Sequence, residues 1–485
     1  MSLFIKKPLA QLMASGGDSD TGLKRTLGAG NLIALGIGAI IGAGLFVRTA
    51  AAAGEAAGPA VVMSFVVAAV GCAFAGLCYA EFASMIPVAG SAYTYAYATM
   101  GEFIAWIIGW ALVLEYALAA ATVSIAWSEY LNNLLVSFDI GVIPYQWCHS
   151  PMETSMDGVQ GIVNLPALGI LLILSLILIK GTKESAMVNA IIVFVKVAIV
   201  LLFIVIGWQF IKPENYTPFM IPAETIGHEA FNKHGWGGVF GGAAIVFFAF
   251  IGFDAVSTAA QEAKNPKRDM PIGILGSLVV CTILYILFAH VLTGIANWQE
   301  FKTAGKEASV AYAIQTYMHG YGWLGKLITL AILAGFSSVI LVMLMGQSRV
   351  FYTMSKDGLI PKVFSDIHPE FRTPYKSNMI LFVFVGVFAG FIPGSMAGDL
   401  TSIGTLFAFV MVCAGIWVMR VKNPEAIRPF KTPLVPVVPI LGILICSAMI
   451  FSLPQDTLLA AGAWMIIGLF IYFLYSKNHS YLRNK

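Results

Sequence analysis

Charged side chains are scarce in this sequence. Aspartate, glutamate, lysine and arginine make up 11% of its 485 residues, whereas hydrophobic residues make up 59%. A water-soluble domain cannot cover its surface with so few charges. The net charge of +3 says little about partners, and without a nucleotide-binding loop no nucleic-acid partner is expected. The composition predicts an all-α polytopic membrane protein, so the lipid bilayer is its expected surroundings.

Patterns that hold metals or carry out catalysis are also missing. The six cysteines and seven histidines show no zinc-ligand spacing, no disulfide framework and no nucleophile–base arrangement. The sequence therefore predicts neither an enzyme nor a protein with a metal or organic cofactor. A cleavable signal peptide is not expected either, because the first 30 residues are polar and glycine-rich and carry Lys6, Lys7, Lys24 and Arg25.

Twelve apolar segments are each long enough to cross about 30 Å of hydrocarbon. They are residues 30–54, 60–87, 101–135, 162–180, 186–210, 238–260, 271–296, 323–354, 376–393, 398–421, 434–452 and 456–475. With the N-terminus placed inside, 21 of the 28 lysines and arginines fall on the inner side and five on the outer side. This positive-inside bias predicts that both termini are cytoplasmic. The five outer residues are Lys212, Lys233, Lys302, Lys306 and Lys326.

The first segment is predicted to be broken. Four glycines lie within residues 36–44, and each weakens a helix by about 1 kcal/mol relative to alanine. A break at membrane depth is tolerated only where protein or a water-filled cavity surrounds it. Freed amides near Ala43 and Gly44 would then bind an anion, and freed carbonyls near Ile40 a cation. The alternative is that the glycines serve close helix packing.

The sixth segment carries a second candidate break. Residues 237–254 are rich in glycine, and aromatic residues surround Gly252 before the carboxylate of Asp254. The first segment begins one group of five predicted segments, and the sixth segment begins the next group of five. Interrupted helices in corresponding positions of two halves indicate a transporter binding site.

These motifs as a set resemble the amino acid–polyamine–organocation superfamily, and within it the bacterial relatives of the cationic amino acid transporters. The resemblance covers about residues 25–475. It rests on GAIIGAG at 38–44, FAFIGFD at 248–254 with Glu262 and Asn265-Pro266, RVFYTMSKDGLIP at 349–361, Thr373-Pro374, and RPFKTPLVP at 428–436.

The resemblance implies a LeuT-like fold of twelve transmembrane helices. Residues 30–210 and 238–421 would form two inverted five-helix repeats, each beginning with a broken span. Residues 434–475 would add two helices, and residues 1–29 would be a cytoplasmic segment.

The resemblance also implies the binding groups for an amino acid. The substrate carboxylate would meet amides near Gly42, Ala43 and Gly44, with Ile41 beside them. The ammonium group would meet carbonyls of Ile40, Phe248, Ala249 and Ile251, and Phe248 would form the aromatic gate over the substrate.

Lys196 lies deep inside the fifth segment, too far from either end to reach water easily. Burial lowers a lysine's pKa, so such a group can exchange a proton near neutral pH. In some bacterial relatives a lysine on this helix takes the place of a sodium ion, and we predict proton coupling here. The alternative is a structural lysine paired to carbonyls of the first span.

Three further residues are candidates for the substrate pocket or its gates. Glu115, in the middle of the third segment, either faces the pocket and attracts a cationic side chain or bonds a neighbouring helix. Asp254 is a candidate for a gating or structural role. Met343 aligns with the side-chain end of the family's pocket, where animal relatives tend to have a smaller residue, and this argues against arginine or lysine as the preferred substrate.

The sequence therefore predicts a secondary active transporter that imports L-amino acids across the plasma membrane by proton symport. The alternatives are an amino acid or polyamine exchanger, a transporter mainly of arginine and lysine, and a transport-like nutrient sensor. The sequence does not specify an accessory subunit.

Overall fold

A computed structural model describes residues 3–8, 27–86, 91–180, 186–224, 233–258, 260, 263–303, 309–371 and 373–483. Most of the predicted segment 1–29 lies outside these ranges, as do Lys24, Arg25, Glu262 and Lys306. Within the described ranges every regular element is a helix and none is a strand, so the predicted helical fold class is confirmed.

The first half of the chain contains long helices and several short helical turns. They are α2 (Ala29–Ile40), η2 (Gly44–Arg48), α3 (Thr49–Ala52), η3 (Ala53–Ala57), η4 (Gly58–Ala60), α4 (Val61–Met85), α5 (Ser91–Thr99), α6 (Glu102–Ser137), η5 (Tyr145–Trp147), α7 (Leu165–Lys180), α8 (Ala186–Gly207), η6 (Trp208–Phe210) and η7 (Pro213–Tyr216).

The second half follows a similar course. Its elements are α9 (Gly235–Val246), η9 (Phe247–Phe250), α10 (Ala255–Thr258), α11 (Pro266–Ile295), η10 (Trp298–Lys302), α12 (Ser309–Tyr317), α13 (Gly322–Lys356), η11 (Lys362–Ser365), α14 (Tyr375–Phe391), α15 (Gly394–Lys422), α16 (Val437–Phe451), α17 (Gln455–Ile471), η12 (Tyr472–Ser476) and α18 (Lys477–His479).

Seven helical runs among the described residues are long and apolar enough to cross a bilayer, and five further apolar helices are shorter. Together they cover all twelve predicted segments. The run Gly44–Met85 joins the later part of the first predicted span to the second span. The chain turns between them at Gly58, whose φ of +61° is a conformation that glycine adopts at little cost.

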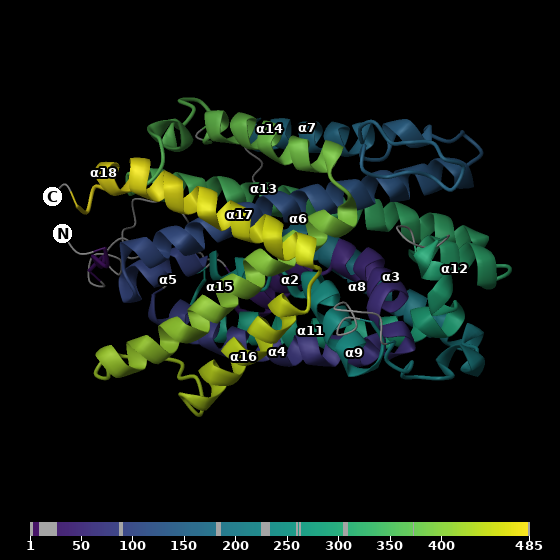
Figure 1. The fold of residues 1–485 in the computed structure, drawn as a ribbon, viewed down its shortest axis with the longest axis horizontal. Helices are drawn as coiled ribbons and strands as arrows, with labels where there is room; N and C mark the ends of the chain where they lie inside the picture. The colour runs from purple at the N-terminus through teal and green to yellow at the C-terminus, as the bar shows by residue number, and fades with distance from the viewer. Residues whose placement is uncertain are drawn as a thin grey trace.

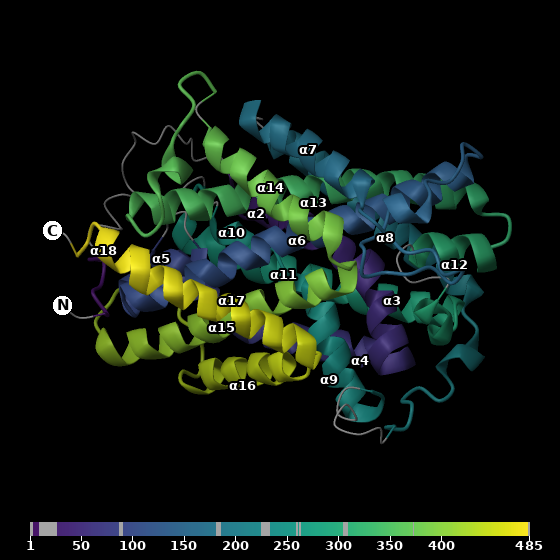
Figure 2. The same cartoon turned by 45° about the horizontal axis from the view of Figure 1, so that its top comes forward.

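Both termini lie at the same end of the molecule, and α12 lies at the opposite end (Figures 1 and 2). The terminal segments meet at the start of α6. Arg483 pairs with the buried carboxylate of Glu102 at 2.5 Å and also donates to the carbonyl of Leu3 at 3.2 Å. These contacts tie both ends of the described chain to the same part of the fold.

The interrupted segments lie among longer helices. The long α6 packs against α13 and α15, while α11 packs against α4 and α2. The peripheral helices α7 and α14 lie side by side in both views (Figures 1 and 2) and contact each other. The breaks in the first and sixth spans are therefore surrounded by protein, as irregular backbone at membrane depth requires.

Candidate functional site

The first span is interrupted after Ile40, as predicted. Ile41 has an extended conformation with φ −72° and ψ 107°, and its amide is the last to donate back into α2, to Ile37 at 2.9 Å. The second half begins where the amide of Leu45 donates to the carbonyl of Gly42 at 3.1 Å. The amides of Gly42, Ala43 and Gly44 therefore occupy the positions that the start of a helix leaves without internal partners.

The sixth span is interrupted in the same manner. Helix α9 tightens into η9 and ends where Ile251 becomes extended, with φ −61° and ψ 134°. Gly252 then has a φ of +115°, a conformation that side-chain-bearing residues rarely adopt. A Cβ added to Gly252 would lie 2.8 Å from the carbonyl oxygen of Ala39. Glycine is thus required here both by conformation and by its close approach to the first span.

The two interruptions are held against each other. A Cβ on Gly44 would overlap the backbone of Ala249, so only glycine lets the segments meet this closely. The hydroxyl of Tyr285 on α11 lies 3.0 Å from the carbonyl oxygen of Ile40 and 2.9 Å from that of Ala249. Because a hydroxyl has one proton, it donates to one of these carbonyls at a time. Tyr285 thus joins the carbonyl ends of both breaks.

A small cavity lies between the interruptions. Its volume is about 10 Å³, enough for about one water molecule. The side chains around the cavity must therefore move before an amino acid can enter. The cavity is lined by Ala39, Ile40, Gly42, Ala43, Gly44, Ala119, Val123, Phe248, Ile251, Val339 and Met343.

Seven of the predicted substrate-binding residues line this cavity: Ile40, Gly42, Ala43, Gly44, Phe248, Ile251 and Met343. The other three lie beside it. Ile41 lines a separate small cavity with Lys196, and Ala249 backs Gly44. Glu115 is fully buried and packs against Gly404 of α15.

Four residues of the lining were not predicted: Ala39, Ala119, Val123 and Val339. Helical spacing contains the signal that would have found three of them, and Ala39 directly precedes the predicted Ile40. Ala119 and Val123 follow Glu115 at steps of four residues, and Val339 precedes Met343 by four. Residues four apart lie on one face of a helix. Every side chain in the lining is apolar, so polar recognition falls to the backbone.

Glu115 and Asp254 are neighbouring buried acids, and Glu115 lies one helical turn before Ala119. The two carboxylates interact electrostatically. Asp254 also accepts a hydrogen bond from the hydroxyl of Tyr116 at 3.2 Å. Both acids are less than 2% exposed. Neither lines the cavity, so any effect of Glu115 on a substrate side chain acts from beside the pocket.

Lys196 joins three predicted spans. Its ammonium group donates to the carbonyl of Gly38, near the end of α2, at 2.9 Å. Its aliphatic stem packs on Gly335 of α13, where an added Cβ would lie 3.0 Å from the lysine Cε. The side chain is buried. Loss of its charge would weaken a contact to the helix end that borders the cavity, because charged donors form the stronger hydrogen bonds.

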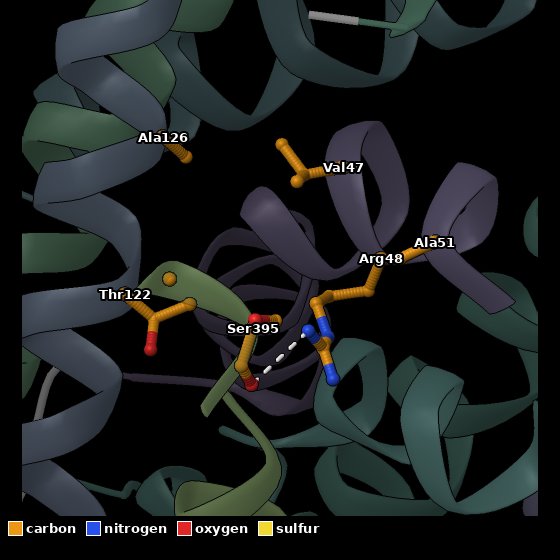
Figure 3. Close-up of a pocket in the computed structure, with 7 residues that line it drawn as sticks. Val47, Arg48, Ala51, Thr122, Ala126 and Ser395 are labelled. Carbon is orange, nitrogen blue, oxygen red and sulfur yellow. Dashed lines mark hydrogen bonds between the residues drawn. The ribbon is translucent and has the colours of Figure 1, made fainter. Parts of the chain in front are cut away.

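An ion pair links the second half of the first span to α15. Arg48, at the end of η2, pairs with Asp399 of α15, and both side chains are buried. The guanidinium also approaches the carbonyl oxygen of Ser395 at 3.4 Å, beside a second small cavity lined in part by Thr122 and Ala126 (Figure 3).

Comparisons with known proteins agree on one family. Residues 27–476 match the family model described as amino acid permease. The branched-chain amino acid permease BcaP of Bacillus subtilis (strain 168) is 44% identical over 481 residues, 99% of both chains. The methylthioribose transporter of the same organism is 41% identical over 481 residues, again 99% of both. The vacuolar cationic amino acid transporter 4 of Arabidopsis thaliana is 33% identical over 429 residues, 88% of this chain and 68% of that one.

Proposed function

The chain belongs to the amino acid permease family, and from this membership we propose a secondary active transporter that imports L-amino acids by alternating access. The observation that carries the proposal is the contact of two interrupted helices around one cavity. Backbone groups freed at such breaks are suited to both ends of a zwitterion. Within this proposal the spans form a LeuT-like pair of inverted repeats in the plasma membrane, with both termini cytoplasmic.

The backbone supplies the recognition groups. The amides of Gly42, Ala43 and Gly44 would bind the substrate carboxylate, because the start of a helix favours negative charge. The ammonium group would meet the carbonyls of the two breaks. Those of Ile40 and Ala249 face the Tyr285 hydroxyl, but a carbonyl oxygen has two lone pairs and accepts a second donor.

The lining supports a neutral aliphatic side chain in the substrate. Ala119, Val123, Val339 and Met343 offer no partner for a guanidinium or ammonium group, and desolvating an unpaired charge is costly. We propose that small neutral amino acids such as alanine are preferred. Branched-chain amino acids are the next candidates, since two relatives, 44% and 35% identical, are named branched-chain amino acid permeases.

Proton symport through Lys196 is the proposed coupling mode. The lysine contacts the inner half of the broken first span, so its protonation state and the position of that half-helix are linked. An obligate exchanger is the alternative, and it would show counterflow without net proton-driven accumulation. A nutrient sensor would bind the amino acid without transporting it.

Uptake into proteoliposomes tests this function. The purified protein is supplied with labelled alanine, leucine, arginine and methylthioribose, each with and without an inward proton gradient. We expect gradient-driven accumulation of alanine, weaker uptake of leucine and little of arginine. Methylthioribose is the second candidate substrate, because a 41% identical relative is named for it. Its uptake with no uptake of any amino acid would contradict the proposal.

A further inference from the structure

A basic pocket lies at the end of α15, and this helix ends on the side of the molecule where both termini lie (Figure 1). It is formed by the last turn of α15 and the loop that leads to α16, and its volume is about 600 Å³. This is far larger than the cavity at the interrupted helices. Its lining comprises Arg420, Pro424, Glu425, Ala426, Ile427, Arg428, Lys431 and Val435.

A buried carboxylate fixes the two arginines of this pocket. Glu81 of α4 is fully buried and accepts two hydrogen bonds from Arg420, at 2.9 and 2.8 Å. Arg428 lies 3.2 Å from the same carboxylate and donates to the carbonyl of Asn423 at 2.6 Å, just past the end of α15. Paired bonds of this kind hold a guanidinium in a defined orientation.

Arg420 keeps donor capacity for a ligand. Its Nε and Nη2 bond to Glu81, and Nη2 also approaches the carbonyl of Thr432 at 3.3 Å. In the part of the chain that the structure describes, its Nη1 has no hydrogen-bond partner, and a quarter of the side chain is exposed. An oriented guanidinium with an open edge is suited to a phosphate oxygen.

Positive charge prevails around the pocket. Lys431 lines it and Lys422 ends α15, and both are exposed. Burial, followed by the charge of Lys422, lowers the pKa of Lys6, so Lys6 is a further cation near the end of α15. The cations Arg420, Lys422, Arg428 and Lys431 outnumber the acids Glu81 and Glu425 by four to two.

Exposed aliphatic side chains are close to these cations along the chain. Val421 is 71% exposed, Ile427 86%, Leu434 75% and Val437 52%. Apolar groups beside basic ones are buried at the boundary of headgroups and acyl chains. This placement would put Arg420 and the two lysines at the depth of lipid phosphates.

We propose that this pocket binds the phosphodiester headgroup of an anionic phospholipid. Arg420 and Lys431 would bind the phosphate, and Lys422 would add electrostatic attraction to it. The exposed aliphatic side chains would contact the start of the acyl chains. Scattered basic residues are expected on any cytoplasmic face, but here they line a defined pocket whose central arginine is held by a buried acid. The site is separate from the cavity between the interrupted helices and does not depend on the transport proposal.

Native mass spectrometry of the delipidated full-length protein tests the proposal. Phosphatidylglycerol and phosphatidylethanolamine are added in separate titrations to the wild type and to Lys422→Gln, Lys431→Gln and the double variant. Each neutralised lysine is expected to weaken phosphatidylglycerol binding about fivefold. Lys362→Gln is the matched control, because Lys362 is also exposed but does not line the pocket. Melting in lipid-free detergent should be the same for all variants.

Three results would overturn the proposal. The first is equal binding of the two lipids, which would show that net negative charge is not recognised. The second is displacement of phosphatidylglycerol by an equal concentration of inorganic phosphate, which would identify a site for the free anion. The third is an equal loss of binding in Lys362→Gln. Because binding is read without any transport assay, failure here leaves the transport proposal intact, and failure of transport leaves this one intact.

Discussion

Gly44 and Ala249 meet where the first and sixth spans are both interrupted. The space for a side chain on Gly44 is occupied by the backbone of Ala249. The first and sixth spans therefore approach each other so closely here that a residue with a side chain at position 44 would push them apart. The shape of the cavity depends on this contact, because Gly44 belongs to its lining.

Gly44→Ala is accordingly expected to abolish transport. The added methyl group must push the two broken spans apart, and overpacking of this kind costs about 1–3 kcal/mol. Gly462→Ala on α17 is the matched control, since an added Cβ there meets nothing within 4 Å. Uptake by the two variants in proteoliposomes provides the measurement, and normal transport by Gly44→Ala would show that the contact is dispensable.

Lys196→Met tests proton coupling. Methionine keeps a similar volume against Gly335 but removes the group that donates to the carbonyl of Gly38. We expect loss of accumulation driven by a pH gradient, with exchange of labelled for unlabelled substrate retained. The two activities are compared in the same proteoliposome preparation. Normal uphill accumulation by Lys196→Met would exclude this lysine as the coupling group.

Met343→Ser tests how side-chain length is selected. Met343 lines the cavity, and overfilling a packed site costs about 1–3 kcal/mol. A close charge pair with Glu115 could offset this by up to about 4 kcal/mol before desolvation, but Glu115 lies beside the cavity and next to Asp254. We therefore expect the steric effect to prevail in the wild type.

Competition against labelled alanine measures this balance. Met343→Ser should admit arginine or lysine, and adding Glu115→Gln should reduce that gain more than it weakens alanine binding. Tight arginine binding by the wild type that Met343→Ser leaves unchanged would contradict the assignment of Met343 to the side-chain end of the pocket.

The buried pair of Arg48 and Asp399 should hold the outer part of the first span closed. Removing one partner of a buried ion pair typically costs about 3–5 kcal/mol, because the other charge stays unpaired. Asp399→Asn should therefore favour opening on this side. Thr122→Cys, placed in the adjoining cavity (Figure 3), should then react faster with an impermeant thiol reagent. The six native cysteines are all buried, so an unchanged rate would argue against a closing role.

His149 predicts a pH dependence of stability. Burial opposes its charged form, but the hydrogen bond and charge of Glu129 and the carbonyl of Tyr145 outweigh burial and raise the pKa above 6.5. Its two ring nitrogens lie 2.9 Å from Glu129 and 3.1 Å from the Tyr145 carbonyl. A raised folded-state pKa contributes stability below the unfolded value, and this is lost as pH rises through the folded value.

Melting curves of the purified protein check this expectation. The wild type should lose more stability than His149→Gln between about pH 5.5 and about pH 8.5, a range that spans histidine titration. Parallel curves for the two proteins would contradict the inferred ion pair with Glu129.

Local sequence features were enough to predict both helix breaks. Four glycines within residues 36–44 indicated the first break, and Gly252 with its aromatic neighbours indicated the second. Both features are local, since glycine weakens a helix wherever it stands. The resemblance then supplied Phe248 and Met343, which the structure brings to one cavity.

Contacts between distant parts of the chain were beyond such reasoning. Asp399 lies 351 residues after its partner Arg48, and nothing in the sequence around either residue indicates the other. Tyr285, which reaches both breaks, looks like an ordinary residue of an apolar span. Glu115 remained ambiguous because its direction is set by the packing of α6 against α15 rather than by its own position.

Substrate competition tests most directly whether the interrupted helices bind an L-amino acid by its backbone. Purified protein in proteoliposomes takes up labelled alanine in the presence of unlabelled alanine, alaninamide, alanine methyl ester or propionate. We predict strong competition by alanine alone, because the amides of Gly42–Gly44 require a carboxylate and the opposing carbonyls require an ammonium group. Equal competition by the amide or the methyl ester would contradict that assignment.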